Sequence, residues 1–153
     1  MLDIIGVGDT NVDVMIRVPH IASHDEKVRG KLLGNFPGGI IGNFCCAAAA
    51  FGAKAGAVCK VGMDGYGELA KSDLQRRGVD VSHMVVDPAC ETYFCMVLLD
   101  DTGEKALTML GRTPKGISAI RPLKNGVISD YELTERMIHY YLRLVMGRFN
   151  FAR

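Results

Sequence analysis

The sequence contains no apolar run that could form a membrane-spanning helix. None of its hydrophobic stretches approaches the roughly 20 residues that such a helix needs. The chain begins at Met1 with apolar alternation and without the basic region of a secretory signal. Its 153 residues are 48% hydrophobic and 23% charged, which is typical of a globular domain with a core. We therefore expect a soluble, cytoplasmic protein.

Metal-binding and disulfide patterns are also missing. Cys-x-x-Cys spacing does not occur, and the number of cysteines is odd, so we expect buried thiols at Cys45, Cys46, Cys59, Cys90 and Cys95. His20 and His24 have the spacing that clamps a metal ion on a helix. They follow Pro19, however, in a segment without helical periodicity. We predict no metal site.

Nucleotide-binding loops are incomplete or absent. Gly6 and Gly8 begin a Gly-x-Gly pattern, but position 11 is Asn and residues 12–18 alternate like a strand. A dinucleotide-binding module is therefore the weakest hypothesis for this chain, after the two functions described below. No Walker-type loop replaces the pattern elsewhere in the sequence.

Charge is distributed unevenly along the chain. Residues 1–110 carry ten Lys and Arg against fourteen Asp and Glu, whereas residues 111–153 carry eight against three. A basic tail of this kind is suited to phosphates or to an acidic membrane surface. A solvated face is the simpler interpretation, and we predict neither a nucleic-acid partner nor membrane contact.

Hydrophobic patterns and turn signals predict alternating strands and helices. The expected strands cover 2–7, 12–18, 29–36, 55–61, 81–86, 92–99 and 105–109, and the expected helices cover 42–51 and 65–77. We expect the first strand to be buried and residues 100–103 to form a hairpin turn between the last two strands. Asp64 is the expected N-cap of the second helix. This alternation favours an α/β fold with a parallel sheet, to which 12–18 and 29–36 add a small antiparallel layer.

The C-terminal residues have a different pattern. Residues 114–127 are rich in turns, and Ser129 with Glu132 forms a capping box. Apolar residues then recur at helical spacing as far as Val145, which predicts an amphipathic helix. Packing on a core is the default for its apolar face, and a membrane or partner surface is the alternative.

A glycine turn precedes the first predicted helix. Gly38 and Gly39 let a ligand approach bare backbone, and the helix start presents N–H groups suited to hydroxyl or phosphate oxygens. Asn43, Asn11 and Asp13 add side-chain donors and acceptors. Singly, such residues are often local caps of turns. Together the three side chains are suited to grip the vicinal hydroxyls of a sugar.

These motifs resemble the ribokinase-like carbohydrate kinases, also called the phosphofructokinase-B family. The resemblance covers about residues 2–109 and rests on Gly8-x-x-Asn11-x-Asp13, Gly38-Gly39-x-x-Gly42-Asn43, Phe51-Gly52-Ala53 and Val61-Gly62-x-Asp64-x-x-Gly67. It implies a partial Rossmann-type sheet and sugar contacts from Asn11, Asp13, Gly38, Gly39 and Asn43. It also implies a lid sheet, formed by 12–18, 29–36 and 92–99, that often mediates dimers. Ile40, Ile41 and Cys45 depart from the family pattern and leave the choice between a sugar and a nucleoside open.

The family's catalytic half has no counterpart in this sequence. Phosphoryl transfer needs an aspartate base, an anion hole and an ATP site with bound cation. In the family these lie at an Asp-Thr-x-Gly-Ala-Gly-Asp motif, and no Gly-Ala-Gly-Asp occurs here. The resemblance thus implies the N-terminal sugar-binding half of an ATP-dependent kinase without a catalytic residue. ATP and Mg²⁺ are expected only for a full-length member.

Residues 109–153 resemble another family. Met109-Leu110-Gly111-Arg112-Thr113-Pro114, the stretch 119–131 and the predicted helix from Glu132 to Val145 look like a segment of the rod-shape-determining bacterial actin (MreB family). Neither phosphate-binding loop of the actin family is present. We expect a chimera of a truncated kinase part, 1–108, and an actin-like segment, 109–153. The alternative function is a non-enzymatic, cytoskeleton-related interaction protein that uses the basic segment.

Half of a kinase sheet leaves an open edge and an uncovered apolar face. Open edges pair with other chains, and large apolar patches associate. The predicted C-terminal helix also needs a partner, because isolated helices of this length are marginal in water. We therefore expect the chain to dimerise or aggregate.

Overall fold

The computed structural model describes residues 1–111, 123–124 and 127–128. The chain divides into two compact units, Met1–Arg112 and Thr113–Arg153. In the second unit, β9 (Leu123–Lys124) pairs antiparallel with β10 (Val127–Ile128). The predicted amphipathic helix lies outside the described residues. No helix among the described residues is long and apolar enough to cross a membrane.

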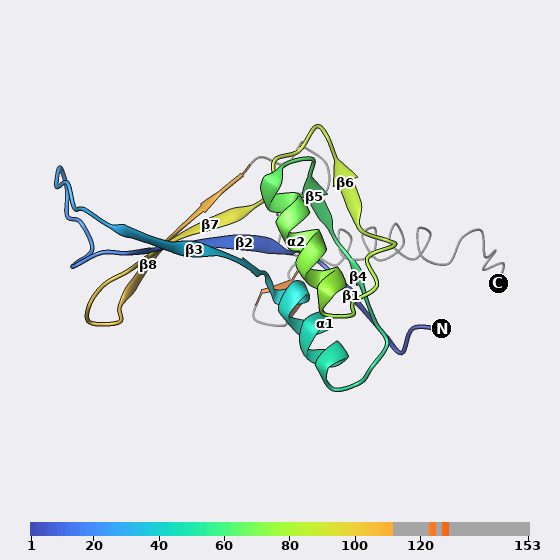
Figure 1. Cartoon of the computed structure of the whole chain (residues 1–153). Helices are drawn as coiled ribbons and strands as arrows, with labels where there is room; N and C mark the ends of the chain where they lie inside the picture. Colours follow the sequence, from blue (N-terminus) through green and yellow to red (C-terminus); the bar gives the residue numbers. More distant parts are fainter. Residues whose placement is uncertain (112–122, 125–126, 129–153) are drawn as a thin grey trace. The chain divides into compact units, whose positions relative to one another are not determined.

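Parallel strand pairs and two helices form one part of the first unit. Strand β1 (Ile4–Val7) pairs with β4 (Ala55–Val58), and β5 (Lys60–Gly62) pairs with β6 (Val85–Asp87). Helices α1 (Ile40–Ala50) and α2 (Gly65–Arg76) pack beside these strands (Figure 1). This arrangement confirms the predicted α/β class.

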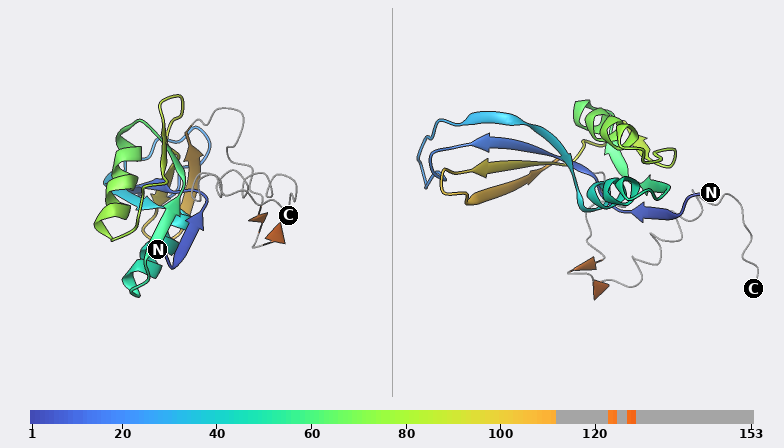
Figure 2. Two further views of the ribbon diagram at one scale, coloured as in Figure 1. Left: turned by 90° about the vertical axis from the view of Figure 1, so that its right-hand side faces the viewer. Right: turned by 60° about the horizontal axis from the view of Figure 1, so that its bottom comes forward.

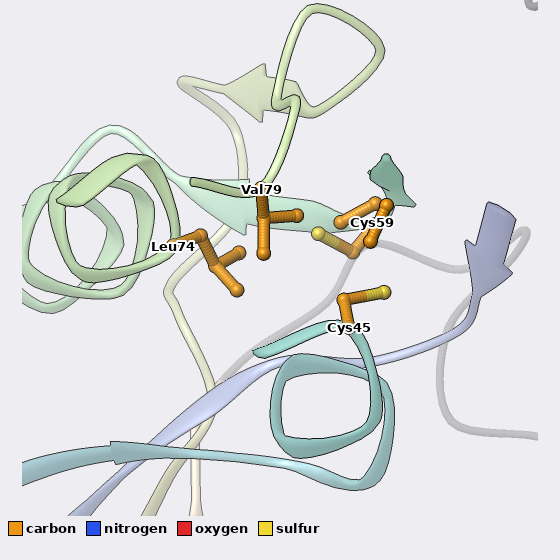
Figure 3. Packing of buried hydrophobic residues seen from close by; sticks show 6 residues of the cluster. Cys45, Cys59, Leu74 and Val79 are labelled. Atoms are coloured by element: carbon orange, nitrogen blue, oxygen red, sulfur yellow. The ribbon is translucent and has the colours of Figure 1, made fainter. Parts of the chain in front are cut away.

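The core of this part lies between α1, α2 and β4. Six buried residues form it, namely Cys45, Ala55, Ala57, Cys59, Leu74 and Val79. Figure 3 shows side chains from both helices and from the strand region directed into the same space. Because four of the six are Ala or Cys, the backbones of helix and strand approach closely.

A four-stranded sheet, here called the lid sheet, extends away from the helices (Figures 1 and 2). Its order is β3 (Lys31–Gly38), β2 (Asn11–Arg17), β7 (Phe94–Leu99) and β8 (Lys105–Leu110). The β2–β3 and β7–β8 pairs are antiparallel, which confirms the predicted layer and hairpin. The central β2–β7 pair is parallel and was not predicted. The connection between these two strands contains β3, α1, β4, β5, α2 and β6, and is therefore long enough for the crossover that a parallel pair needs.

Three strand predictions require correction. The strand predicted at 55–61 is interrupted at Cys59, which separates β4 from β5. The strand predicted at 81–86 begins only at Val85, because the Met84 N–H donates to the Val81 carbonyl at 3.0 Å and closes a turn. The N-terminal strand was predicted to be buried, but Ile5 and Val7 are 41% and 39% exposed. Their side chains alternate with Gly6, whose backbone faces Cys45 of α1.

The helix boundaries lie close to their predicted positions. Helix α1 begins at Ile40, two residues before the predicted start, and its N-cap Gly39 supplies no capping side chain. Helix α2 begins as predicted after Asp64, whose carboxylate accepts a hydrogen bond from the Gly67 N–H at 2.8 Å. The glycines after the two helices have positive φ, which is typical of helix C-termini.

The cysteines are free thiols, as predicted. Four are buried, and Cys46 on α1 is half-buried. Burial raises the pKa of Cys59 to about 12. This thiol therefore stays protonated at neutral pH and acts as a core side chain.

Gly67→Ala is expected to destabilise the chain. An added Cβ would overlap the Gly62 carbonyl oxygen and come within 2.9 Å of Thr92 Oγ1. Because backbone atoms would have to move, we expect a loss of roughly 2–3 kcal/mol in the free energy of unfolding, measured by urea denaturation.

Gly65→Ala in the same helical turn is the matched control. No atom lies within 4 Å of the Cβ it would add. It should be neutral or stabilise the chain by up to about 1 kcal/mol through helix propensity. Equal effects of the two substitutions would contradict this packing of α2.

Candidate functional site

Two polar side chains of the candidate site lie at the start of β2. Asn11 is paired with Gly38 of β3, and Asp13 is paired with Phe36. The Asn11 side chain is largely buried, and its Nδ2 donates to Asp13 Oδ1 at 3.0 Å. Residues two apart on a strand point to the same face, so the amide and the carboxylate form one polar group on the lid sheet.

Gly38 lets this polar group lie against bare backbone. A Cβ at this position would come within 2.9 Å of Asp13 Oδ2 and 3.4 Å of Asn11 Oδ1. A side chain at residue 38 would therefore occupy the space beside the carboxylate. The sequence motif and the structure agree on why glycine is needed here.

Gly39 turns the chain from β3 into α1. Its φ is +89°, and a Cβ would lie 2.7 Å from the Thr10 Cα and 3.0 Å from the Asn11 nitrogen. Both the backbone conformation and the close approach favour glycine. Since residue 39 has no capping side chain, the first N–H groups of α1 lack a side-chain acceptor from their N-cap.

Asn43 lies one turn into α1. Its backbone N–H donates to the Gly39 carbonyl at 3.0 Å, and its side chain is exposed. The structure therefore brings four predicted residues, Asn11, Asp13, Gly38 and Gly39, into direct contact. It places the fifth on the adjacent helical turn.

A pocket of about 320 Å³ adjoins these residues between α1 and α2. Gly38 and Asn43 line it, whereas Asn11, Asp13 and Gly39 do not. On the α2 side it is bounded by Asp73 and Arg77, whose Nε donates to Asp73 Oδ2 at 2.7 Å. Because Asp73 also pairs with Arg76, its carboxylate is already satisfied. The pocket thus touches the candidate site at one edge.

Thr10 is a site residue that the sequence analysis missed. Its side chain is buried, and its Oγ1 donates to the Gly38 carbonyl at 3.0 Å. A Cβ at Gly42 would lie 2.9 Å from the same hydroxyl. Thr10 therefore fixes the strand-end turn to the glycine turn. Thr10 could have been predicted from its hydroxyl group, because it directly precedes Asn11 in the turn that packs against the glycine turn.

Two of the residues that depart from the family pattern are accommodated by glycines. A Cβ at Gly6 would lie 2.5 Å from Cys45 Sγ, and one at Gly8 would lie 2.7 Å from Ile41 Cγ1. The larger side chains of α1 thus occupy space that β1 and its following turn leave open. Ile40 is different, because it is 79% exposed beside the glycine turn.

The electrostatics of the site rest on Asp13. Its neighbour Cys95, paired with it across β2 and β7, has a raised pKa because of burial and because of the Asp13 charge. A raised pKa keeps this thiol neutral and removes it as a nucleophile at neutral pH. The site therefore offers no activated thiol at neutral pH.

The predicted absence of a metal site remains a prediction. Among the residues that the structure describes, no group of three His, Cys, Asp or Glu could hold a metal ion. His20 Nε2 lies 2.6 Å from Glu26 Oε1, whereas His24 Nε2 lies 3.9 Å from Asp25 Oδ2. The two histidines are thus associated with different carboxylates.

Two family models match the chain. The pfkB family carbohydrate kinase model matches residues 1–113, and the MreB/Mbl protein model matches residues 96–153. Among curated relatives, the MreB of Haemophilus influenzae is 56% identical over 51 residues, covering 33% of this chain and 14% of that protein.

Curated kinases match the first part of the chain. The fructokinase of Salmonella typhimurium is 39% identical over 106 residues, which is 69% of this chain and 31% of the enzyme. The ATP-dependent ribose-1-phosphate kinase of Halopiger xanaduensis is 32% identical, over 70% of this chain and 36% of the enzyme. The chain therefore spans about a third of the length of these kinases.

Solved structures show the same fold. The ribokinase of Thermotoga maritima superposes with a TM-score of 0.64 at 23% identity, covering 72% of this chain and 37% of that chain. The Arabidopsis thaliana ribokinase, complexed with ribose and ATP, gives a TM-score of 0.65 at 20% identity, over 71% of this chain and 36% of that one. With a family model matched over residues 1–113 and a ribokinase-type fold, this chain belongs to the pfkB family of carbohydrate kinases.

Proposed function

We propose that residues 1–113 are the sugar-binding half of a carbohydrate kinase and that the chain alone does not transfer phosphate. The observation that carries the proposal is the Asp13 carboxylate, held by Asn11 against the bare backbone of Gly38. A carboxylate with a free lone pair, next to a side-chain amide and a helix start, is suited to a polyhydroxyl ligand. The names of the curated kinase relatives point to the same substrate class.

Each group in the site has a role in this proposal. Asp13 accepts hydrogen bonds from two neighbouring hydroxyls, and each charge-assisted bond contributes roughly 1.5–3 kcal/mol. Asn11 orients the carboxylate, and Thr10 fixes the backbone of Gly38. The first turn of α1 supplies N–H donors. A nucleoside would use the same hydroxyl contacts, so the sugar and nucleoside alternatives both remain.

In this proposal, ATP and Mg²⁺ bind only to a full-length member of the family. The sequence contains neither the Gly-Ala-Gly-Asp motif nor a Walker-type loop. In the family, that motif carries the aspartate base and the anion hole that phosphoryl transfer requires. We therefore assign no step of phosphoryl transfer to this chain.

A second candidate function is a non-enzymatic interaction protein. The match of residues 96–153 to the MreB/Mbl model favours it. In this proposal the basic residues Arg112, Arg121 and Lys124 and the predicted helix at 131–145 bind a filament or another partner, and the kinase-like part is a scaffold. These residues lie outside the described part of the chain, except for the backbone of Lys124.

Asp13→Ala should abolish the rise in melting temperature that D-fructose or D-ribose gives the wild-type chain. The substitution removes the proposed acceptor of the sugar hydroxyls. Differential scanning fluorimetry at increasing sugar concentration measures the shift. Asp101→Asn is the control, because Asp101 pairs with the exposed Arg17 in the lid sheet and should leave the shift unchanged. A shift that survives Asp13→Ala would show that this is not the sugar site.

The chain alone should neither hydrolyse ATP nor phosphorylate a sugar. The physical reason is that a base, an anion hole and a cation site are all required. A coupled assay for ADP release, with D-fructose, ATP and Mg²⁺, measures this. ADP release above the buffer rate that disappears in Asp13→Ala would contradict the proposal.

Self-association should depend on the kinase-like part. The described residues expose several large apolar side chains on the lid sheet, namely Leu32, Leu33, Phe36, Leu107 and Met109. Sedimentation velocity over a range of concentrations should show dimers or larger species of the full chain. Replacing Arg112, Arg121 and Lys124 with Gln should leave this association unchanged. Loss of association in that variant would favour the interaction-protein function. A chain that stays monomeric at every concentration would contradict self-association through either the lid sheet or the basic residues.

A further inference from the structure

Asp64 bonds to two different segments of the chain. Its Oδ1 accepts a hydrogen bond from the Gly67 N–H at 2.8 Å, which caps α2. Its Oδ2 accepts one from the Thr92 N–H at 2.7 Å, and Thr92 lies two residues before β7 of the lid sheet. A helix cap needs only one acceptor oxygen. The second bond ties the base of the lid sheet to the start of α2.

The segment at Thr92 is enclosed by tight backbone packing. The Thr92 side chain is buried, and its Oγ1 accepts a hydrogen bond from the Gly62 N–H at 2.8 Å. A Cβ at Gly62 would lie 2.5 Å from the Cys90 carbonyl oxygen and 2.6 Å from Asp64 Oδ2. A Cβ at Gly111, directly after β8, would lie 2.9 Å from the Thr92 carbonyl oxygen. Both ends of the β7–β8 hairpin thus meet at this point.

Further contacts connect the Thr92 segment with the candidate sugar site on β2. The rings of Tyr66, in the first turn of α2, and Phe94, the first residue of β7, have centroids 4.9 Å apart. The Val12 N–H of β2 donates to the Tyr93 carbonyl at 3.2 Å. In the parallel β2–β7 pair, Cys95 lies beside Asp13. Asp64 is therefore connected to Asp13 through one short stretch of strand.

We propose that Asp64 is a positioning residue that holds the lid sheet, which carries Asn11 and Asp13, to the helices through Thr92. The inference rests on the proposed function for its effect on ligand affinity. Asp13 and Asn11 belong to the lid sheet, whereas the first turn of α1 does not. A sugar that bonds to both needs the two parts in one relative orientation. The carboxylate of Asp64 holds that orientation from outside the site.

Asp64→Ser separates the cap from the link to the lid. Serine at an N-cap accepts a bond from the third helical N–H, so the bond to Gly67 is retained. Its short side chain has one oxygen and leaves the Thr92 N–H without this acceptor. Asp64→Asn is a second variant with the same expectation, because its amide also offers a single acceptor oxygen.

Hydrogen exchange of the full chain, followed by mass spectrometry, tests the link without a ligand. In both variants, peptides from β7 and β2 should exchange roughly tenfold faster than in wild type, while peptides from α2 keep their protection. Asp80→Ser is the control, since the Asp80 carboxylate accepts a hydrogen bond from the Ser82 N–H at 2.8 Å, in a turn outside the lid sheet. Unchanged exchange in β7, or equal acceleration in α2 and β7, would overturn the proposal.

Calorimetric titration of D-fructose into the same variants of this 153-residue chain tests whether Asp64 affects sugar affinity. The dissociation constant should rise roughly tenfold in Asp64→Ser, in line with the loss of one charge-assisted bond. An unchanged constant with faster exchange in β7 would also overturn the positioning role. If wild type binds no sugar, the proposed function fails, and the exchange experiment still decides whether Asp64 holds the lid sheet.

Discussion

The Gly38–Gly39 backbone approaches the turn before β2 so closely that this contact fixes how β3, β2 and α1 are joined. Cβ atoms at these two positions would collide with Asp13 and with the backbone of Thr10. Because no side chain intervenes, the end of β3, the start of β2 and the first turn of α1 meet at one point. The polar group of Asn11 and Asp13 lies at this point. Fold and candidate site therefore share one cause.

A second tight contact, at the first turn of α2, complements the first. Gly62 and Gly67 admit the Thr92 segment, and Asp64 bonds to it. The lid sheet is thus joined to the helices at β3 through the glycine turn and at β7 through α2. Two attachments at different strands restrict rotation of the sheet more than one would. A site built from both parts benefits from this restraint, since orientation of binding groups lowers the cost of binding.

Local signals predicted much of this structure, and long-range pairing accounts for most of what they missed. The Asp64 cap, helix α2 and the β7–β8 hairpin each depend on residues close in sequence, and all were predicted. The parallel β2–β7 pairing joins strands separated by two helices, so no local pattern encodes it. The break at Cys59 and the Thr10 bond to Gly38 also depend on distant partners. The meeting of four predicted site residues could be predicted because each lies in a glycine turn or near a strand end. At such positions the residue type indicates both the backbone geometry and the binding chemistry.

We expect a sugar to bind where Asp13 meets the glycine turn. Chemical-shift mapping of the ¹⁵N-labelled full chain during titration with D-fructose tests it most directly, because every perturbed amide is assigned to a residue. The perturbed signals should be concentrated at residues 10–13 and 37–44, including the Asn11 side-chain amide. Shifts centred instead on Ala50, Ala70 and Arg77 would place the ligand in the pocket between the helices, and no shifts at all would contradict sugar binding by this chain.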